Sequence, residues 1–405
     1  MLTILLSAVL LASQQGFITD AFVRSSNQNR ALFRASTIAP TTIIATNHLQ
    51  QQQKPSSALR SFSATLASLP QAAKIGVALA AFIAAALNLN KALWVPSRKY
   101  DQESNSVGKE YDAWESDGIL EYYWGEHIHL GYYTDDVIRE SDWLPPKKNF
   151  IQAKFDFIDE MLKFGKFDTT SKPKKILDVG CGIGGTTRYL AKAFGPETEI
   201  TGITLSGNQV NRATALAKEQ GTPNAKFVMM DALKMTYPDN SFDLVWACES
   251  GEHMPDKQAY VEEMTRVLKP GGRIVIATWC QRDEGNSPFN DYEKKMLRFL
   301  YDEWTHPYFI SINDYKNLME GTGQLRAVVT ADWTRQTITS WLHSIWVGVF
   351  DPWPVFTKPR VWLKTFYDGL ALYRMHKSFR KGLMQYGMMC AIKKDEGEVS
   401  TAGLF

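Results

Sequence analysis

This sequence of 405 residues lacks clustered cysteines, an excess of charge of one sign, and any long apolar run. Its four cysteines, Cys181, Cys248, Cys280 and Cys390, lie far apart and form no CxxC pair. The sequence therefore indicates neither a disulfide framework nor a zinc site, and we predict no metal. The formal net charge is +2, whereas nucleic-acid-binding proteins usually carry a clear basic excess. We expect no nucleic acid among the partners.

Acidic residues are absent from residues 21–70, a segment that is rich in Ser, Thr, Ala and Gln and carries basic charges. That composition is typical of a transit peptide. Before it, residues 1–12 form an apolar run like the core of a signal peptide. This order resembles the two-part plastid presequences of algae with secondary plastids, with Asp20-Ala21-Phe22-Val23 at the junction. We predict a signal-like segment at 1–22 and a disordered, transit-peptide-like segment at 23–70. The alternative is a polar tail without a targeting role.

A second apolar run, residues 75–89, lies between Lys74 and Lys91. About fifteen residues are short for a bilayer span at roughly 1.5 Å per residue. Lys91 and Trp94 are residue types that occur at membrane interfaces. We predict a hydrophobic anchor at 71–95 that associates with a plastid envelope or thylakoid membrane. The alternative is a buried, Ala-rich helix.

From residue 171 onward, short apolar strands alternate with helical segments. Strands are expected at 174–180, 199–205, 225–232, 242–250, 273–279, 325–334 and 386–394, and helices at 186–194, 207–221 and 257–272. This alternation predicts an α/β fold with a doubly wound, mostly parallel sheet. The expected domain spans 171–394 and contains an aromatic, largely helical insertion at about 337–383. An aromatic and helical cap is expected at 100–170, and a tail at 395–405.

The first expected strand leads into a glycine loop, Asp178-Val179-Gly180-Cys181-Gly182-Ile183-Gly184-Gly185, which opens a helix. Glycines there permit a tight turn and close approach of a ligand to the backbone. A dinucleotide site would also require an acid about twenty residues further on for the ribose. Here the second strand ends in Thr204-Leu205-Ser206 without an acid. The acid that precedes the first glycine, Asp178, suits a cationic ligand such as S-adenosylmethionine.

The glycine loop, Asp231 after the third strand and LKPGG before the fifth resemble class I S-adenosylmethionine-dependent methyltransferases across residues 174–279. The resemblance implies a Rossmann-like fold and S-adenosylmethionine as the cofactor. Asp231 is expected to accept from the adenine amino group, and Thr204, Ser206 or Gln209 to hold the ribose. Cys181 is interpreted as a small loop residue, since methyl transfer needs no covalent intermediate. A dinucleotide oxidoreductase and an inactive cofactor-binding module are the alternatives. The expected cofactor-binding residues are Asp178, Val179, Gly180, Cys181, Gly182, Gly184, Thr204, Leu205, Ser206, Gln209, Asp231, Ala232 and Glu249.

The fourth strand delivers Glu249, Glu252 and His253 to the edge of the sheet where ligands of open α/β sheets bind. A histidine can hold or take the proton of a phenolic hydroxyl near neutral pH. His253 is therefore the first candidate for the proton acceptor, with a structural role in capping or bracing as the alternative. His127 and His129 are second candidates, because alternate residues of an extended segment share a face. The predicted catalytic set is His253, His127, His129 and Glu252.

The stretches ILDVGCGIGGTTRYLA, GITLSGNQVNRA and ESGEHMPDK resemble the tocopherol-pathway methyltransferases. One group of that family methylates 2-methyl-6-phytyl- or solanesyl-1,4-benzoquinol, and another methylates γ-tocopherol. The first group has sequences similar to the stretches DAWESDGILEYYWGEHIHLGYY and LYDEWTHPYF, whereas the glutamate at position 252 resembles the second group. The resemblance implies ring C-methylation of a lipophilic prenyl-quinol in the plastid. Its prenyl chain is expected to lie against aromatic residues of 122–133 and against Trp341, Trp346, Trp353 and Trp362, which otherwise form an ordinary core.

Overall fold

The structure, a computed structural model, describes residues 100–397 except 104, 139–143, 168–171, 286, 359–360 and 396, together with scattered positions from 70 to 96. Two compact units are present, Met1–Val95 and Pro96–Phe405. The predicted segments 1–22 and 23–70, most of the predicted anchor at 71–95 and most of the predicted tail lie outside the described residues. Over the part of the chain that is described, no helix combines the length and apolarity needed to cross a membrane.

The second unit is built on a seven-stranded sheet with the strand order β3-β2-β1-β4-β5-β7-β6. The first five strands in this order are parallel, and β7 runs antiparallel to both β5 and β6. This arrangement confirms the predicted doubly wound, mostly parallel α/β fold. The strands are β1 (Lys175–Val179), β2 (Glu199–Thr204), β3 (Ala225–Met229), β4 (Phe242–Cys248), β5 (Leu268–Gln281), β6 (Leu325–Asp332) and β7 (Met384–Lys393).

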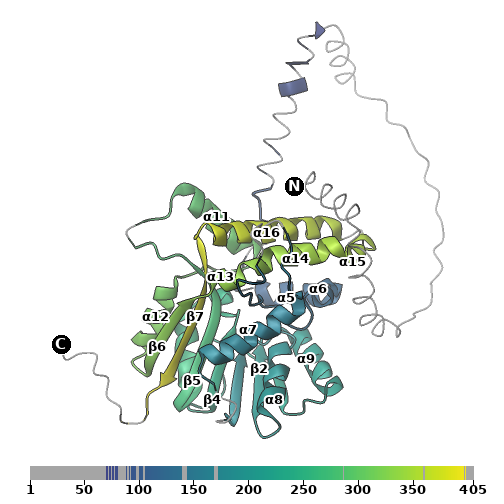
Figure 1. Ribbon diagram of the computed structural model, residues 1–405. Helices are drawn as coiled ribbons and strands as arrows, with labels where there is room; N and C mark the ends of the chain where they lie inside the picture. Colours follow the sequence, from purple (N-terminus) through teal and green to yellow (C-terminus); the bar gives the residue numbers. More distant parts are fainter. Residues whose placement is uncertain are drawn as a thin grey trace. The chain divides into compact units, whose positions relative to one another are not determined.

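Helices cover both faces of the sheet and its carboxyl edge (Figure 1). Before the sheet come α5 (Ser106–Asp117), α6 (Ile119–Trp124) and α7 (Phe150–Phe164). Within the alternating part come α8 (Gly185–Phe194), α9 (Gly207–Glu219), the short 3-10 helix η1 (Gly251–His253), α10 (Lys257–Val267), α11 (Asp291–Glu303) and α12 (Ile312–Gly321). Between β6 and β7 come α13 (Thr334–Thr337), α14 (Thr339–Phe350), α15 (Trp353–Phe356) and α16 (Trp362–Arg380).

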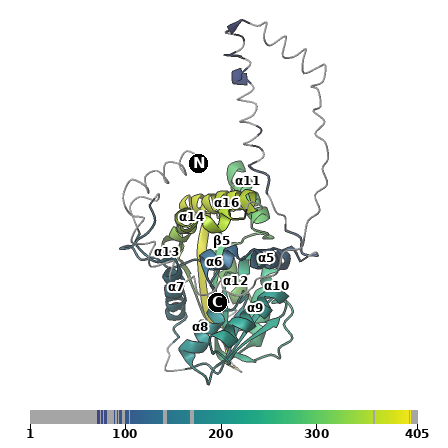
Figure 2. The ribbon, with the colours of Figure 1, turned by 90° about the vertical axis from the view of Figure 1, so that its right-hand side faces the viewer.

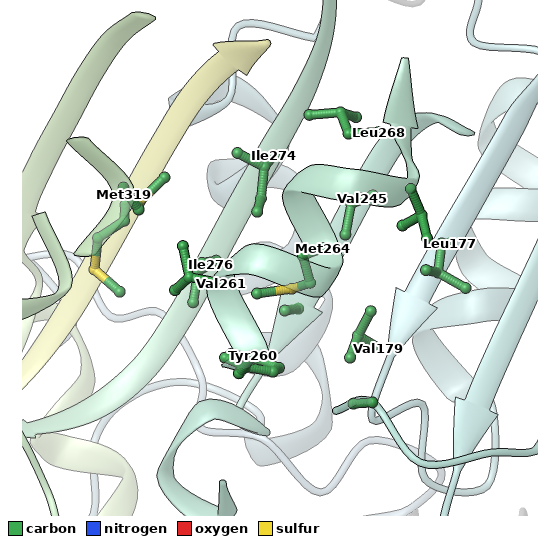
Figure 3. Packing of buried hydrophobic residues seen from close by; sticks show 14 of the residues in the cluster. Leu177, Val179, Val245, Tyr260, Val261, Met264, Leu268, Ile274, Ile276 and Met319 are labelled. Carbon is green, nitrogen blue, oxygen red and sulfur yellow. The ribbon is translucent and has the colours of Figure 1, made fainter. Parts of the chain in front are cut away.

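The main core lies between one face of the sheet and α10 with α12 (Figure 3). Val245 of β4 and Ile276 of β5 point from the sheet toward Val261 and Met264 of α10, and all four are fully buried. Burying each such side chain stabilises the fold by about 1.5–3 kcal/mol. On the opposite face, the ring of Phe157 on α7 packs edge-on against Tyr386 of β7. The sheet is therefore covered on both faces, as a mostly parallel sheet requires.

The largest boundary difference lies between α10 and β5. The sequence predicts a helix closed by Pro270-Gly271-Gly272 and a strand from 273, whereas α10 ends at Val267 and β5 begins at Leu268. Pro270 explains the difference, because a proline lacks the N–H of a helix and its ring disfavours the helical conformation of the preceding residue. The LKPGG stretch is extended and pairs irregularly with the start of β4.

The carboxyl ends of the parallel strands point toward α14 and α16, which lie together beyond that edge of the sheet (Figures 1 and 2). α14 also packs against α6 and α7. The insertion and the segment from α5 to α7 therefore meet at the edge where the glycine loop and the end of β4 lie.

Candidate functional site

The glycine loop joins the end of β1 to the start of α8. Gly180, Gly182 and Gly184 have φ values of 84°, 54° and 78°, a region that side-chain-bearing residues rarely adopt. A Cβ on Gly180 would lie 2.3 Å from the Cβ of Ser250, so this residue must be glycine for the loop to reach β4. A Cβ on Gly182 would meet no described atom within 4 Å. The loop is thus packed at one glycine and open at the other, which leaves its backbone accessible to a ligand.

Cys181, inside this loop, is buried and close-packed. A Cβ built on Gly202 of β2 would lie 2.8 Å from the sulfur of Cys181, so the loop rests directly on the neighbouring strand. Burial raises the pKa of the Cys181 thiol well above its usual range. A nucleophilic cysteine needs a lowered pKa. In this structure the Cys181 thiol is therefore a close-packed loop side chain that keeps its proton at neutral pH.

Asp178, at the end of β1, is buried and accepts a hydrogen bond of 2.6 Å from the hydroxyl of Thr187 on α8. Burial raises the pKa of Asp178 to about 6, only partly offset by that hydrogen bond. The next residue, Val179, accepts through its carbonyl from the Ser250 hydroxyl at 2.7 Å. A buried carboxylate with a raised pKa gains stability from a nearby cation, which is the electrostatic fit that a sulfonium or ammonium group needs.

The residues after β2 that were predicted to bind the cofactor are hydrogen-bonded to one another. The hydroxyl of Thr204 donates to the side-chain oxygen of Gln209 at 2.6 Å, and Ser206 caps α9 by accepting from the Gln209 backbone N–H at 3.1 Å. The side-chain nitrogen of Gln209 is buried without a hydrogen-bond partner in the described structure. Leu205 is partly exposed. A polar group left unpaired in this way is costly unless a ligand satisfies it.

Asp112 of α5 supplies the acid that the sequence lacks after β2. Its carboxylate accepts a hydrogen bond from the Ser206 hydroxyl, so an acidic side chain from the cap stands at the carboxyl end of the second strand. No local pattern around β2 could have identified it, because the two residues are 94 positions apart in the sequence.

The two residues predicted after β3 differ in environment. Asp231 is exposed and accepts a hydrogen bond of 2.9 Å from the backbone N–H of Leu233. Ala232 is buried in the main core. Asp231 therefore remains accessible to a ligand, while Ala232 contributes packing.

Glu249, one residue beyond β4, connects the sheet to the aromatic segment 118–133. It adopts a φ of 51°, and its carboxylate accepts from the backbone N–H of Leu130 and from the hydroxyl of Tyr386, both at 2.7 Å. Burial raises the pKa of Glu249. A strained backbone that places a buried carboxylate is a feature typical of functional sites.

His127 and His129 do point to the same side, with ring centroids 5.4 Å apart. Their rings pack on α7, His127 against Phe155 and His129 against Phe157, with centroid separations of 4.8 and 5.3 Å. Burial lowers the pKa of both, that of His129 to about 3, so both are uncharged at neutral pH.

The two ring nitrogens of His129 differ. Its Nδ1 donates to the carbonyl of Leu130 at 2.8 Å, whereas its Nε2 lies buried without a partner among the described residues. The Nδ1 atom of His127 lies 3.5 Å from the hydroxyl oxygen of Thr186 on α8. His129 therefore offers one free acceptor nitrogen, and His127 mainly contacts the helix that follows the glycine loop.

His253 ends η1 and is half-buried, whereas the other three predicted catalytic residues are buried. Its Nε2 lies 3.0 Å from the hydroxyl of Tyr111 on α5, and its ring stacks on His306 with centroids 4.2 Å apart. Burial lowers the pKa of His253 to about 3. Burial also raises the pKa of Tyr111, so the tyrosine keeps its proton at neutral pH. The pair is a neutral imidazole facing a protonated phenol.

His306 and Tyr111 are site residues that the sequence did not single out. His306 is 1% exposed, and neither ring nitrogen has a hydrogen-bond partner within the described part of the chain. Trp279, at the end of β5, packs on His306 and on Trp341 of α14, with centroid separations of 5.4 and 4.9 Å. The only sequence signal for His306 was its place within LYDEWTHPYF.

Glu252 braces the turn after β4. It is buried and accepts from the hydroxyl of Thr278 on β5 at 2.6 Å. Lys257 donates to the carbonyls of Gly251 and Glu252 at 2.7 and 3.0 Å. Burial raises the pKa of Glu252 and lowers that of Lys257 to about 7. Both side chains fix the backbone that presents His253.

The tryptophans predicted to line the prenyl chain separate into two groups. Trp341 is fully buried against Trp279, whereas Trp353 and Trp362 expose 62% and 48% of their surface. Trp341 thus lies beside the end of β5, and Trp346 is half-buried and stacks on Phe350. Among the described residues, no three His, Cys, Asp or Glu side chains are placed to hold a metal ion.

The segment 118–133 is bonded to several elements at once. The backbone N–H of Gly131 donates to the hydroxyl of Ser340 on α14 at 2.7 Å, and that of Tyr132 donates to the carbonyl of Ala153 on α7 at 2.8 Å. Glu126 forms an ion pair of 2.6 Å with the buried Arg188 of α8. The segment therefore joins the loop helix, α7 and the insertion over the carboxyl edge of the sheet.

Comparisons with known proteins agree with this arrangement. Residues 177–276 match the family model of the methyltransferase domain. The chain is 43% identical to 2-methyl-6-phytyl-1,4-hydroquinone methyltransferase of Synechocystis sp. over 319 residues, which cover 78% of this chain and 96% of the relative. It is 36% identical to the chloroplastic tocopherol O-methyltransferase of Arabidopsis thaliana, over 69% of this chain and 80% of the relative.

Solved structures share the fold at lower identity. Geranyl diphosphate C-methyltransferase of Streptomyces coelicolor superposes with a TM-score of 0.55 at 17% identity, over 74% of this chain and 99% of that one. Phosphoethanolamine N-methyltransferase 2 of Haemonchus contortus, in complex with S-adenosyl-L-methionine, superposes with a TM-score of 0.55 at 17% identity, over 69% and 57%.

Proposed function

The chain belongs to the family of S-adenosylmethionine-dependent methyltransferases of the tocopherol pathway, and on that premise we propose that it methylates a ring carbon of a prenylated 1,4-benzoquinol. The observation that carries the proposal is that similarity to the Synechocystis enzyme covers 96% of that enzyme. It therefore extends well beyond the general methyltransferase domain at 177–276. The extra similarity must include segments such as 118–133, which lies over the carboxyl edge of the sheet and contacts Glu249.

The residues at the glycine loop fit S-adenosylmethionine, which when bound supplies a methyl group on a positively charged sulfur. The carboxylates of the buried Asp178 and the half-buried Glu249, both with a raised pKa, favour a cationic ligand. The open face at Gly182 admits a ligand to the loop backbone. Asp112 and the unpaired side-chain nitrogen of Gln209 are placed to hold hydroxyl groups beyond β2. We assign the adenine amino group to the exposed Asp231.

The acceptor hydroxyl is assigned to His253. A neutral imidazole accepts a hydrogen bond from a phenolic hydroxyl, and His253 is kept neutral by burial. Sharing that proton makes the ring carbon beside the hydroxyl more electron-rich and therefore a better nucleophile. Nε2 of His253 donates to the Tyr111 hydroxyl in this assignment, and Nδ1, which has no partner among the described residues, accepts from the quinol hydroxyl. Holding the ring carbon in line with the methyl donor lowers the entropic part of the barrier.

The second polar contact of the acceptor is assigned to His306. Its two unpaired ring nitrogens lie next to His253 in an aromatic cluster with Trp279 and Trp341. Unpaired buried nitrogens cost about 1–3 kcal/mol each, and a second hydroxyl of the quinol would remove part of that cost. The neighbouring indoles provide an apolar wall for the ring and the start of the prenyl chain.

A plastid location is proposed with this activity. The acid-free segment at 23–70 has transit-peptide composition, and the relatives from Arabidopsis thaliana and Oryza sativa are named as chloroplastic enzymes. Association with a plastid membrane is proposed because the proposed substrate, a prenyl-quinol, dissolves in the bilayer. The apolar run at 75–89 supports such an association.

A second candidate is methylation of γ-tocopherol. The relatives named tocopherol O-methyltransferase favour it. The resemblance of the sequence at Glu252 to the γ-tocopherol group favours it as well. In the structure Glu252 accepts from Thr278 and braces a turn, which is a role that does not depend on the acceptor.

A competition assay distinguishes the two acceptors. The full chain in detergent micelles receives S-adenosylmethionine with a labelled methyl group and equal amounts of 2-methyl-6-phytyl-1,4-hydroquinone and γ-tocopherol. The proposal predicts that the hydroquinone product carries most of the label at short times. Label that enters only the tocopherol product would contradict the proposal and favour the second candidate.

A further inference from the structure

Helix α15 lies where α14 and α16 meet (Figure 1), and five exposed aromatic side chains belong to residues 350–366 of these three helices. Phe350, Trp353, Phe356, Trp362 and Phe366 expose 54%, 62%, 56%, 48% and 40% of their surfaces. Three of the rings are direct neighbours, with centroid separations of 6.3 Å for Trp353–Phe356 and 6.0 Å for Phe356–Trp362. Soluble monomers rarely leave contiguous apolar patches in water unless the patch binds something. We call these five side chains the aromatic tip.

The aromatic tip is fixed by contacts behind it. The indole N–H of Trp362 donates to the carbonyl of Val355 at 2.9 Å, which holds α15 against the start of α16. Asp351 accepts at 2.6 Å from the hydroxyl of Tyr122, and its carbonyl accepts at 2.5 Å from the hydroxyl of Tyr123. These bonds join the aromatic tip to α6, directly before His127. The exposed rings are therefore presented by a braced structure that reaches the candidate site.

The chemistry of the aromatic tip favours a lipid surface over a protein partner. Between residues 350 and 366 the sequence contains Lys358, Arg360 and Lys364 and one acid, Asp351, whose side chain accepts from Tyr122. Tryptophan and phenylalanine beside lysine and arginine suit the headgroup region, where rings enter the acyl boundary and cations meet anionic headgroups. Lysine is depleted at protein–protein interfaces.

We propose that the aromatic tip docks onto the surface of a bilayer that contains anionic lipids. Trp353, Phe356 and Trp362 enter the acyl boundary, and Lys358 and Lys364 lie beside the headgroups. This surface is distinct from the predicted anchor at 71–95 and is bonded to the cap through Asp351. The docking itself does not depend on the proposed function. Its purpose does, since a prenylated acceptor would be drawn from the same bilayer.

The test asks whether Trp353 touches acyl chains. The full chain is mixed with vesicles of phosphatidylcholine and phosphatidylglycerol whose acyl chains carry bromine, which quenches tryptophan fluorescence on contact. We expect quenching of the parent, and we expect Trp353→Phe to lose the largest share of it. Trp346→Phe is the matched control, because Trp346 is half-buried against Phe350 on the same insertion. Trp353→Phe with the same quenching as the parent, or a parent that is not quenched, would overturn the proposal.

Two further measurements separate the sources of binding. The variant Lys358→Glu/Lys364→Glu should lose quenching on vesicles with phosphatidylglycerol, and quenching that is independent of these charges would contradict an anionic surface. In lipid-free buffer, the variant Trp353→Ser/Phe356→Ser should have the same oligomeric state, measured as molar mass in solution, as the parent. A parent oligomer that this variant dissociates would show that the aromatic tip is a subunit interface, contrary to the proposal. None of these measurements uses the methyl acceptor, so their failure is distinguishable from failure of the proposed function.

Discussion

At the scale of residues, the proposed methyl transfer depends on His253 and on the side chains around it. Tyr111 faces its Nε2 at 3.0 Å, and His306 stacks on its ring. The sequence placed His253 correctly at the end of the fourth strand, because strand ends are visible in the pattern. Tyr111 and His306 belong to distant segments, and their approach to His253 is a product of tertiary packing that no local pattern contains.

Replacing His253 should slow methyl transfer without releasing the cofactor. We expect His253→Gln to lower kcat by about 10²–10³-fold, the usual contribution of a positioned proton acceptor, with little change in the affinity for S-adenosylhomocysteine. Tyr111→Phe is the control and should cost about tenfold, since it removes a positioning hydrogen bond and leaves the imidazole. Steady-state kinetics with calorimetric cofactor binding provide both readouts. Turnover of His253→Gln close to that of the parent would exclude His253 from the reaction.

Acid should destabilise the fold through its buried histidines. The pKa of His129 is lowered to about 3 by burial, whereas a histidine in an unfolded chain titrates near 6.5. Below about pH 6.5 the unfolded chain therefore binds a proton that the folded chain refuses. The stability that this neutral histidine contributes is complete above pH 6.5 and is lost as pH falls toward 3, at up to about 1.4 kcal/mol per pH unit.

His129→Asn isolates this effect. The free energy of unfolding of the variant, measured by urea denaturation between pH 7 and pH 4, should fall less steeply than that of the parent. The comparison of slopes is unaffected by any constant loss of stability from the substitution. Equal slopes would show that His129 is already protonated in the folded chain or is exposed to water.

At the scale of elements, the glycine loop is the part that the sequence described best. Its strand, its turn and its helix follow the predicted order, and the predicted glycines adopt positive φ. The boundary between α10 and β5 was misplaced because the strand begins at Leu268, before the Pro270-Gly271-Gly272 stop that closed the predicted helix. The acid for the second strand was also missed, because Asp112 comes from α5.

Gly182 and Gly221 form a matched pair for testing the loop. Their φ values are 54° and 65°, and a Cβ on either meets no atom of the described residues within 4 Å. Alanine at either position should therefore cost about 1 kcal/mol of stability for the same backbone reason. Only Gly182→Ala should weaken binding of S-adenosylhomocysteine, by about tenfold or more, as titration calorimetry would measure. Equal affinities of the two variants would place the cofactor elsewhere.

At the scale of the whole molecule, the two reactants are held by different parts of the chain. We assign the methyl donor to the loop and the strand ends, whose positions in the sheet the sequence pattern predicted. Helix α5, the segment 118–133 and the insertion close over that edge, and Glu249 is bonded to the segment 118–133 through Leu130 and to β7 through Tyr386. The sequence identified these segments by their resemblance to a family, but their contacts follow from packing between residues far apart in the chain.

The position of the transferred carbon tests the central claim most directly. The full chain is given S-adenosylmethionine with a ¹³C-labelled methyl group and 2-methyl-6-phytyl-1,4-hydroquinone, and the product is examined by carbon NMR. We predict one new aryl methyl signal on a ring carbon beside a hydroxyl. A labelled methoxy signal, or an unmodified hydroquinone under conditions in which γ-tocopherol is methylated, would contradict the assignment of this chain as a quinol ring C-methyltransferase.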